Sequence, residues 1–170
     1  MRNTIFGAAA VAASLLTTTP ALAANPEAML SKALVLKPLT LTRLEDLDFG
    51  DMVPSGTGDF VAIDADSGAR SSGSAILLPT NAGQRAEFAS SGLNNVLVGL
   101  VISPPSDLLN GAGNKLKVTR LTLDQGNNPI RILTPISQVF FVGIGGEVYL
   151  RPNQEEGVYS GTFTLTATYY

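Results

Sequence analysis

The chain has 170 residues and a net charge of −3, and it contains no histidine, cysteine or tryptophan. Without histidine and cysteine it lacks the usual general base, the thiol nucleophile and the preferred zinc ligands, so we expect neither an enzyme nor a bound cofactor. The small negative charge also argues against nucleic acid or an anionic membrane surface as a partner.

Residues 1–23 have the pattern of a secretory signal peptide. Arg2 gives the charged start, a short alanine-rich apolar run follows, and Ala21-Leu22-Ala23 is a small-x-small cleavage site. We therefore expect cleavage between Ala23 and Ala24, and export to the periplasm, the cell surface or the medium. The apolar run is shorter than the roughly 20 residues that a membrane-spanning helix needs, so we expect no membrane span after signal removal.

The rest of the chain alternates short apolar segments with Gly, Pro and Asn turns, and no window has a helical period. The segments expected to form strands are 33–43, 59–64, 74–78, 85–90, 96–103, 116–123, 139–144, 147–151 and 162–170. Pro38 cannot donate a ladder hydrogen bond, so the first strand is expected to be bent, divided or at an edge. The dipeptide Gly145-Gly146 predicts a hairpin turn or a bulge. The pattern predicts an all-β protein with one antiparallel immunoglobulin-like β-sandwich over residues 37–170, preceded by an extension over 24–36.

The last stretch, 162–170, alternates strictly between two kinds of side chain. One face carries Phe163, Leu165, Ala167 and Tyr169, and the other carries threonines and Tyr170. Because alternate side chains of a strand point to opposite faces, this stretch is expected to be half-buried. A strand needs a partner on each side unless it lies at an edge, so the functional question is what pairs with this strand.

Two groups of acidic residues are the candidates for a metal or a catalytic pair. Asp46, Asp48 and Asp51 could supply oxygen ligands to calcium, but they lack the glycine and the glutamate that an EF-hand loop requires. A pair of carboxylates of the kind that glycosidases use could come from Glu45, Asp46, Asp48 and Asp51, or from Asp64 with Asp66. The alternative for both groups is solvated loop carboxylates.

Three parts of the sequence resemble a domain-of-unknown-function family of bacterial secreted proteins, over essentially the whole mature chain. They are PLTL at 38–41 leading to LDFG at 47–50, then RAEFA at 85–89, then GGEVYL at 145–150 leading to GVYSGTF at 157–163. The final motif, Gly-x-Tyr-x-Gly-Thr-aromatic before an alternating strand, also resembles subunits of chaperone–usher pili and the related spore-coat-U group.

The pilus resemblance implies a sandwich that lacks its last strand. A periplasmic chaperone fills the gap first, and the N-terminal extension of the next subunit then replaces it by β-strand addition. The implied partners are therefore this chaperone, an usher and further copies of the chain. The implied donor is 24–36, with Leu30, Leu34 and Leu36 on one face, interrupted by Lys32. The implied acceptor carries Phe163, Leu165, Ala167 and Tyr169.

The expected function is therefore a non-enzymatic structural protein, a pilus- or fimbria-like subunit that assembles with its own kind at the cell surface. The alternative is a self-contained secreted or periplasmic binding module. Its sandwich would be complete, and loops around 46–58 or 103–115 would contact a ligand.

Overall fold

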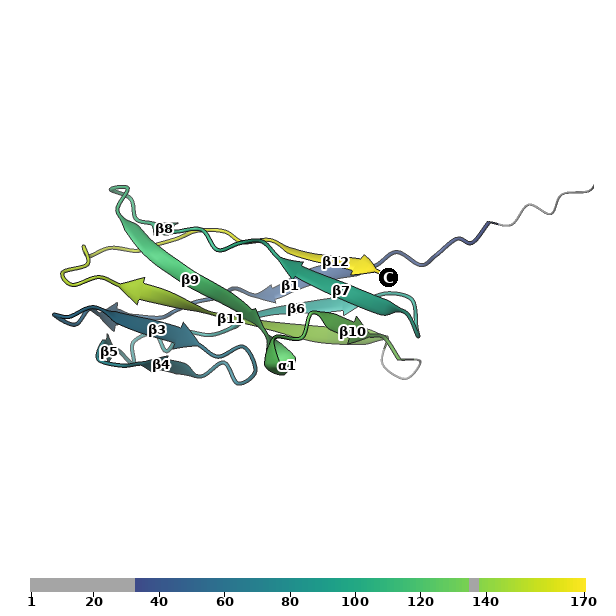
Figure 1. Cartoon of the computed structure of the whole chain (residues 1–170), viewed down its shortest axis with the longest axis horizontal. Helices are drawn as coiled ribbons and strands as arrows, with labels where there is room; N and C mark the ends of the chain where they lie inside the picture. Colours follow the sequence, from purple (N-terminus) through teal and green to yellow (C-terminus); the bar gives the residue numbers. More distant parts are fainter. Residues whose placement is uncertain (1–32, 135–137) are drawn as a thin grey trace, which may run out of the picture. The chain divides into compact units, whose positions relative to one another are not determined.

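The computed structural model describes residues 33–134 and 138–170. The chain divides into two compact units, 1–34 and 35–170, and every strand of the described part belongs to the second unit. The predicted signal peptide, its cleavage site at Ala23 and Ala24, and the predicted donor residue Leu30 lie outside the described residues. The second unit is an antiparallel β-sandwich, which confirms the predicted fold class (Figure 1).

The larger sheet has seven strands and forms one layer of the sandwich. Its path runs β1-β6-β11-β3-β4, while β9 pairs with the other side of β11 and β8 pairs with β9. The strands are β1 Thr40–Glu45, β3 Asp59–Ile63, β4 Arg70–Ser72, β6 Ala86–Ser91, β8 Leu108–Leu109, β9 Lys115–Leu123 and β11 Val139–Leu150. All of these pairings are antiparallel, as expected for strands joined by short turns.

The second layer is a three-stranded sheet in the order β10-β7-β12. It consists of β10 Ile130–Ile132, β7 Leu97–Ile102 and β12 Leu165–Tyr169, and the apolar β7 is central, as its composition suggests. A small ladder of β2 Met52–Val53 and β5 Ile76–Leu77 lies outside both sheets. The short helical segment α1, Asp124–Asn127, follows β9, and Gln125 and Gly126 within it have positive φ angles.

The core between the layers has two clusters of buried side chains. One cluster lies between the small sheet and β6, β9 and β11, and contains Ala86, Val98, Leu100, Leu123, Leu133, Val142, Ile144 and Leu165. The other contains Phe49, Val61, Ile63, Ala75, Leu116, Val118, Val148 and Leu150. Each fully buried Val, Leu or Ile contributes about 1.5–3 kcal/mol to folding, so these two clusters are the main source of stability.

Of the two alternatives predicted at Gly145-Gly146, the hairpin turn is wrong, whereas the ladder of β11 with β9 does shift its register beside the glycines, between Glu147 and Val148. β11 continues through both glycines as one strand of 12 residues. A Cβ on Gly145 would lie 2.2 Å from the carbonyl oxygen of Ile63, and one on Gly143 would lie 2.4 Å from that of Ala65. The glycines therefore allow the segment after β3 to cross closely over β11, and they mark close packing of two backbones rather than a reversal of the chain.

The first predicted strand, 33–43, also begins later than expected. β1 starts at Thr40, and residues 33–39 take no part in any strand. Leu34 is 84% exposed and Val35 is 92% exposed. The proline at position 38, which cannot donate to a ladder, lies just before the point where pairing with β6 begins.

Asp59 at the start of β3 makes a testable contribution to stability. Its carboxylate accepts hydrogen bonds from the backbone amides of Ala75 (2.7 Å) and Ser74 (2.6 Å), and these bonds lower the pKa of Asp59 below its usual value. A lowered folded-state pKa adds stability that is fully present above the unfolded-state value and is lost as the pH falls through the folded-state value. Asp59→Asn should therefore lower the urea midpoint near neutral pH, and its deficit relative to the natural chain should shrink below about pH 4.

Urea unfolding near neutral pH and again at about pH 2.5 measures this deficit. Glu156→Gln is the matched control, because the Glu156 carboxylate has no hydrogen-bond or ion-pair partner among the described residues. A deficit for Asp59→Asn that stays constant over this range contradicts the role assigned to the carboxylate.

Candidate functional site

An apolar-floored groove of about 1090 Å³ opens between the edges of the two layers. One wall is formed by residues 43–54, which comprise the end of β1 and the segment that follows it. The opposite wall is formed by residues 154–163, which lead into β12, together with 105–108. Its floor consists of side chains from both core clusters and their neighbours: Phe49, Ala86, Phe88, Leu116, Val118, Leu121 and Leu150. The hydrophobic core is thus accessible from this side.

β12 is an edge strand of the described part of the chain, because within residues 33–134 and 138–170 it pairs only with β7 (Figure 1). The Thr164 carbonyl accepts a hydrogen bond from the residue after β7 (2.8 Å), and the Tyr170 amide donates one to the first residue of β7 (3.0 Å). Hydrogen-bonded pairs alternate along an antiparallel ladder, so the backbone groups of Leu165, Ala167 and Tyr169 are directed away from β7. The edge beside the β1 layer therefore has unpaired strand positions.

The side chains of the predicted acceptor face point toward the core. Leu165 is buried, and Phe163, Ala167 and Tyr169 pack against the same core cluster from partly buried positions. Phe163 precedes the strand, which is shorter than the sequence predicted, and its ring packs edge-on against Phe88 with ring centroids 6.4 Å apart. The predicted alternation is confirmed over β12, while its role as an acceptor stays a prediction.

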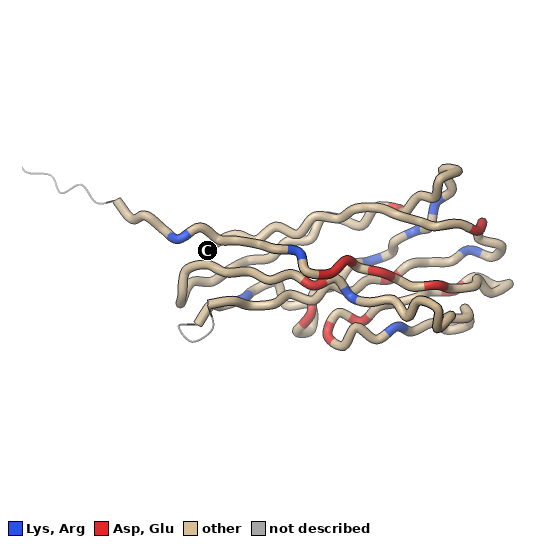
Figure 2. The backbone as a smooth tube through the Cα atoms, turned by 180° about the vertical axis from the view of Figure 1, so that it is seen from behind, with Lys and Arg blue, Asp and Glu red and all other residues tan. Residues whose placement is uncertain are grey.

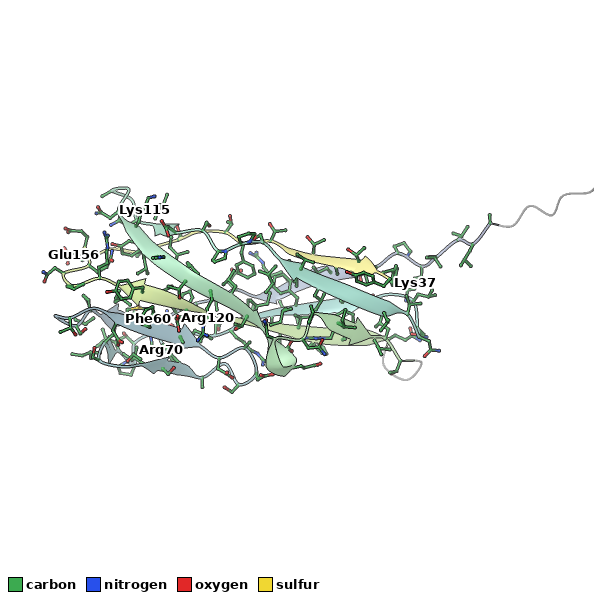
Figure 3. All side chains as sticks on the ribbon, in the orientation of Figure 1. Lys37, Phe60, Arg70, Lys115, Arg120 and Glu156 are labelled. Atoms are coloured by element: carbon green, nitrogen blue, oxygen red, sulfur yellow. The ribbon has the colours of Figure 1, made fainter. Side chains whose placement is uncertain are left out.

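The junction between the extension and the sandwich lies at Lys37. The Lys37 carbonyl accepts a hydrogen bond from the Tyr169 hydroxyl (3.0 Å), which itself accepts one from the Leu93 amide (2.6 Å). Figure 3 shows Lys37 beside the end of β12 and Glu156 at the far end of the segment that leads into β12. Of the predicted donor residues, Leu34 and Leu36 are exposed and belong to no strand.

One groove wall is fastened to the large sheet by Arg70 of β4. Its guanidinium donates to the carbonyls of Phe49 (3.1 Å), Asp51 (3.0 Å) and Leu78 (2.7 Å). Three backbone carbonyls bound to one planar donor keep the 49–51 segment in a fixed position. Figure 3 labels Arg70 beside β4. The groove is therefore a formed feature of the fold.

The three aspartates proposed for calcium lie along this wall but have different partners. Asp46 pairs with Arg43 (2.9 Å), the Asp48 carboxylate accepts from the Gly50 amide (2.7 Å), and the Asp51 carboxylate accepts from a threonine hydroxyl. Within residues 33–134 and 138–170, no three acidic, histidine or cysteine side chains gather into a possible metal site. The structure gives the calcium hypothesis no support.

The second acidic pair forms turns. The Asp64 carboxylate accepts from the hydroxyl (2.6 Å) and the amide (2.7 Å) of Ser67, and these bonds lower the pKa of Asp64. Asp66 accepts from the Gln125 amide (2.5 Å). A general acid in a glycosidase needs a raised pKa, so Asp64 lacks the property that a catalytic acid requires.

The two loops suggested for ligand contact, 46–58 and 103–115, contribute residues to opposite walls of the groove. Sequence reasoning treated them as separate candidates and did not assign residues 154–161 to any site. The signal that marks residues 154–161 is the pair Glu155-Glu156 close to an apolar residue, Val158, which is 88% exposed.

Comparisons with known proteins identify a family. No curated protein and no solved structure matches the chain. No helix within the described part is both long enough and apolar enough to span a membrane. One family model, Domain of unknown function (DUF4402), matches residues 39–169, which covers the sandwich with both groove walls and β12. The chain therefore belongs to the DUF4402 family of domains of unknown function.

Proposed function

We propose that this protein is an exported, non-enzymatic structural subunit that assembles by donor-strand exchange into a pilus- or fimbria-like polymer. In this proposal, residues 24–36 of one copy enter the groove of the next copy and pair with the free edge of β12. In the cell, a periplasmic chaperone and an usher would hold and deliver each subunit before the polymer forms at the cell surface. The resemblance of the final motif to pilus subunits supports the same reading.

The observation that carries the proposal is the groove beside an unpaired strand edge. A sandwich normally closes its core, and exposed strand edges are covered, shortened or charged because they pair with other chains. Here Leu165, Ala167 and Tyr169 turn their side chains to the core and their backbone groups to the open edge. An added strand would satisfy those backbone groups and cover the apolar floor at the same time.

The described end of the extension supports the proposed donor. Leu34 and Leu36 alternate along the chain, are exposed, and belong to no strand of their own sandwich. Exposed leucines cost solvation free energy that burial in a neighbour's groove would recover, about 1.5–3 kcal/mol for each. The extension therefore has a physical reason to bind a second copy.

Electrophoresis of the exported protein in detergent, with and without boiling, tests this proposal. Strand-exchanged joints open very slowly, so we expect a ladder of multimers without boiling and one band after boiling. The ladder should disappear when residues 24–35 are deleted and when Leu34→Asp places a charge on the donor face. Val101→Asp is the matched control, because Val101 is 62% exposed on β7 and lines no part of the groove. A single monomer band from the natural chain under both conditions contradicts strand exchange.

A monomer would favour the second candidate, a self-contained binding module. The observation in its favour is that both suggested ligand loops line one groove with an apolar floor. Such a groove suits an extended apolar ligand. In that case deletion of residues 24–35 would leave binding unchanged, whereas Leu121→Asp on the groove floor would abolish it.

A further inference from the structure

The groove is acidic around its apolar floor. Six of the chain's 14 acidic residues line it, against one of its 11 lysines and arginines, Arg43. The six are Glu45, Asp46, Asp48 and Asp51 on one wall, and Glu155 and Glu156 on the other. Figure 2 shows the acidic residues of the described chain as red segments of the backbone tube. Carboxylates beside a low-dielectric floor concentrate negative potential in the groove, which attracts a cationic occupant.

The carboxylates of the two walls differ in whether they already have hydrogen-bond or ion-pair partners. Glu45, Asp46, Asp48 and Asp51 each bond to a side chain or an amide of the same wall or its neighbours. The side chains of Glu155 and Glu156 have no hydrogen-bond or ion-pair partner within the described residues. The hydrogen bonds found at these two residues are accepted by their main-chain carbonyls. Glu155 and Glu156 are therefore free to meet a charge brought by an occupant.

The proposed donor carries one cation, Lys32, at a position that interrupts its apolar face. In an extended strand Lys32 lies on the same side as Leu30, Leu34 and Leu36. A lysine among leucines can bury its aliphatic stem while its ammonium group reaches water or a carboxylate. In a groove with acidic walls, the positive charge of Lys32 would therefore be opposite carboxylates of the neighbouring copy.

We propose that Lys32 of one copy binds between the acidic walls of the next copy's groove and sets the register of the donor strand. This inference rests on the proposed function, and it names the occupant as a second copy of this chain. Leucines at every second residue tolerate a slip by two, because the same face still points inward. A single charged position removes that degeneracy, since only one register brings the ammonium group to the carboxylates. The same attraction speeds the encounter of the two copies.

The test follows multimer formation by the full exported chain after its polymers are dissociated by heat and cooled. The natural chain should assemble about tenfold more slowly at high salt than at low salt, because salt screens the attraction. Lys32→Met should make assembly independent of salt, and Lys32→Glu should slow it about tenfold at low salt. Adding Glu155→Lys and Glu156→Lys to Lys32→Glu should restore the rate, since the charges are then exchanged.

Lys37→Glu is the matched control, because it makes the same change in net charge. The Lys37 carbonyl accepts a hydrogen bond from Tyr169 of its own sandwich. This variant should assemble as fast as the natural chain. If Lys32→Glu assembles as fast as Lys37→Glu and both depend equally on salt, the role of Lys32 is overturned while strand exchange stands. If the natural chain forms no multimers at all, strand exchange itself fails. Rescue by the exchanged charges, and by them alone, establishes the pairing.

Discussion

Under the proposed strand exchange, a second copy of residues 24–36, joined after Tyr170 by a short flexible linker, is expected to give a stable monomer. The added segment follows β12 directly, so it can reverse and pair antiparallel along the same free edge. Covering the groove with the leucines corresponding to Leu30, Leu34 and Leu36 should raise the free energy of unfolding by about 5 kcal/mol, allowing for partial burial in the unfolded chain.

That gain corresponds to a rise in Tm of roughly 10–20 °C for a domain of this size, which a thermal scan measures. The detergent ladder should vanish in the same variant, because the groove is already occupied. The control is the same appended segment with serine at its three leucine positions, which should leave both the Tm and the ladder of the natural chain unchanged. Equal Tm values for the two appended segments would show that the groove accepts no donor from this chain.

The sequence predicted the fold class and the final strand because both depend on local patterns. Strict alternation from Phe163 to Tyr169 defines which face of the strand is buried, and this assignment does not require knowing which strand lies alongside. Gly145-Gly146 was misread for the opposite reason. A turn and a close crossing both favour glycine, and only the position of Ile63 across the strand distinguishes them.

The groove could not be predicted from the sequence, because its walls come from parts of the chain that are far apart. Residues 43–54 and 154–163 face each other only after β6, β9 and β11 are assembled between them. The acidic stretch at 45–51 was visible in the sequence, and calcium was a reasonable hypothesis for it. Its partners, such as Asn81 for Asp48, are determined by tertiary contacts. The sequence raised the question of what pairs with the last strand, and the topology shows on which side of β12 the free edge lies.

The second large effect is expected at Arg131, the buried arginine of β10. Its side chain is 4% exposed, and its guanidinium bonds to the carboxylate of Asp124 and to the carbonyl of Asn128 (2.6 Å). Asp124→Ala removes the counter-charge and leaves a buried cation, so it should lower the free energy of unfolding by about 3–5 kcal/mol. In urea this appears as a lower midpoint with an unchanged slope.

The double variant Asp124→Ala with Arg131→Met separates the charge effect from the packing effect. Replacing both members of a buried ion pair by apolar groups is often nearly neutral, so the double variant should be more stable than Asp124→Ala alone. The coupling between the two sites should be about 1–3 kcal/mol. If Asp124→Ala costs less than about 1 kcal/mol, the pair is solvated like an exposed ion pair, and the buried-charge account of Arg131 is wrong.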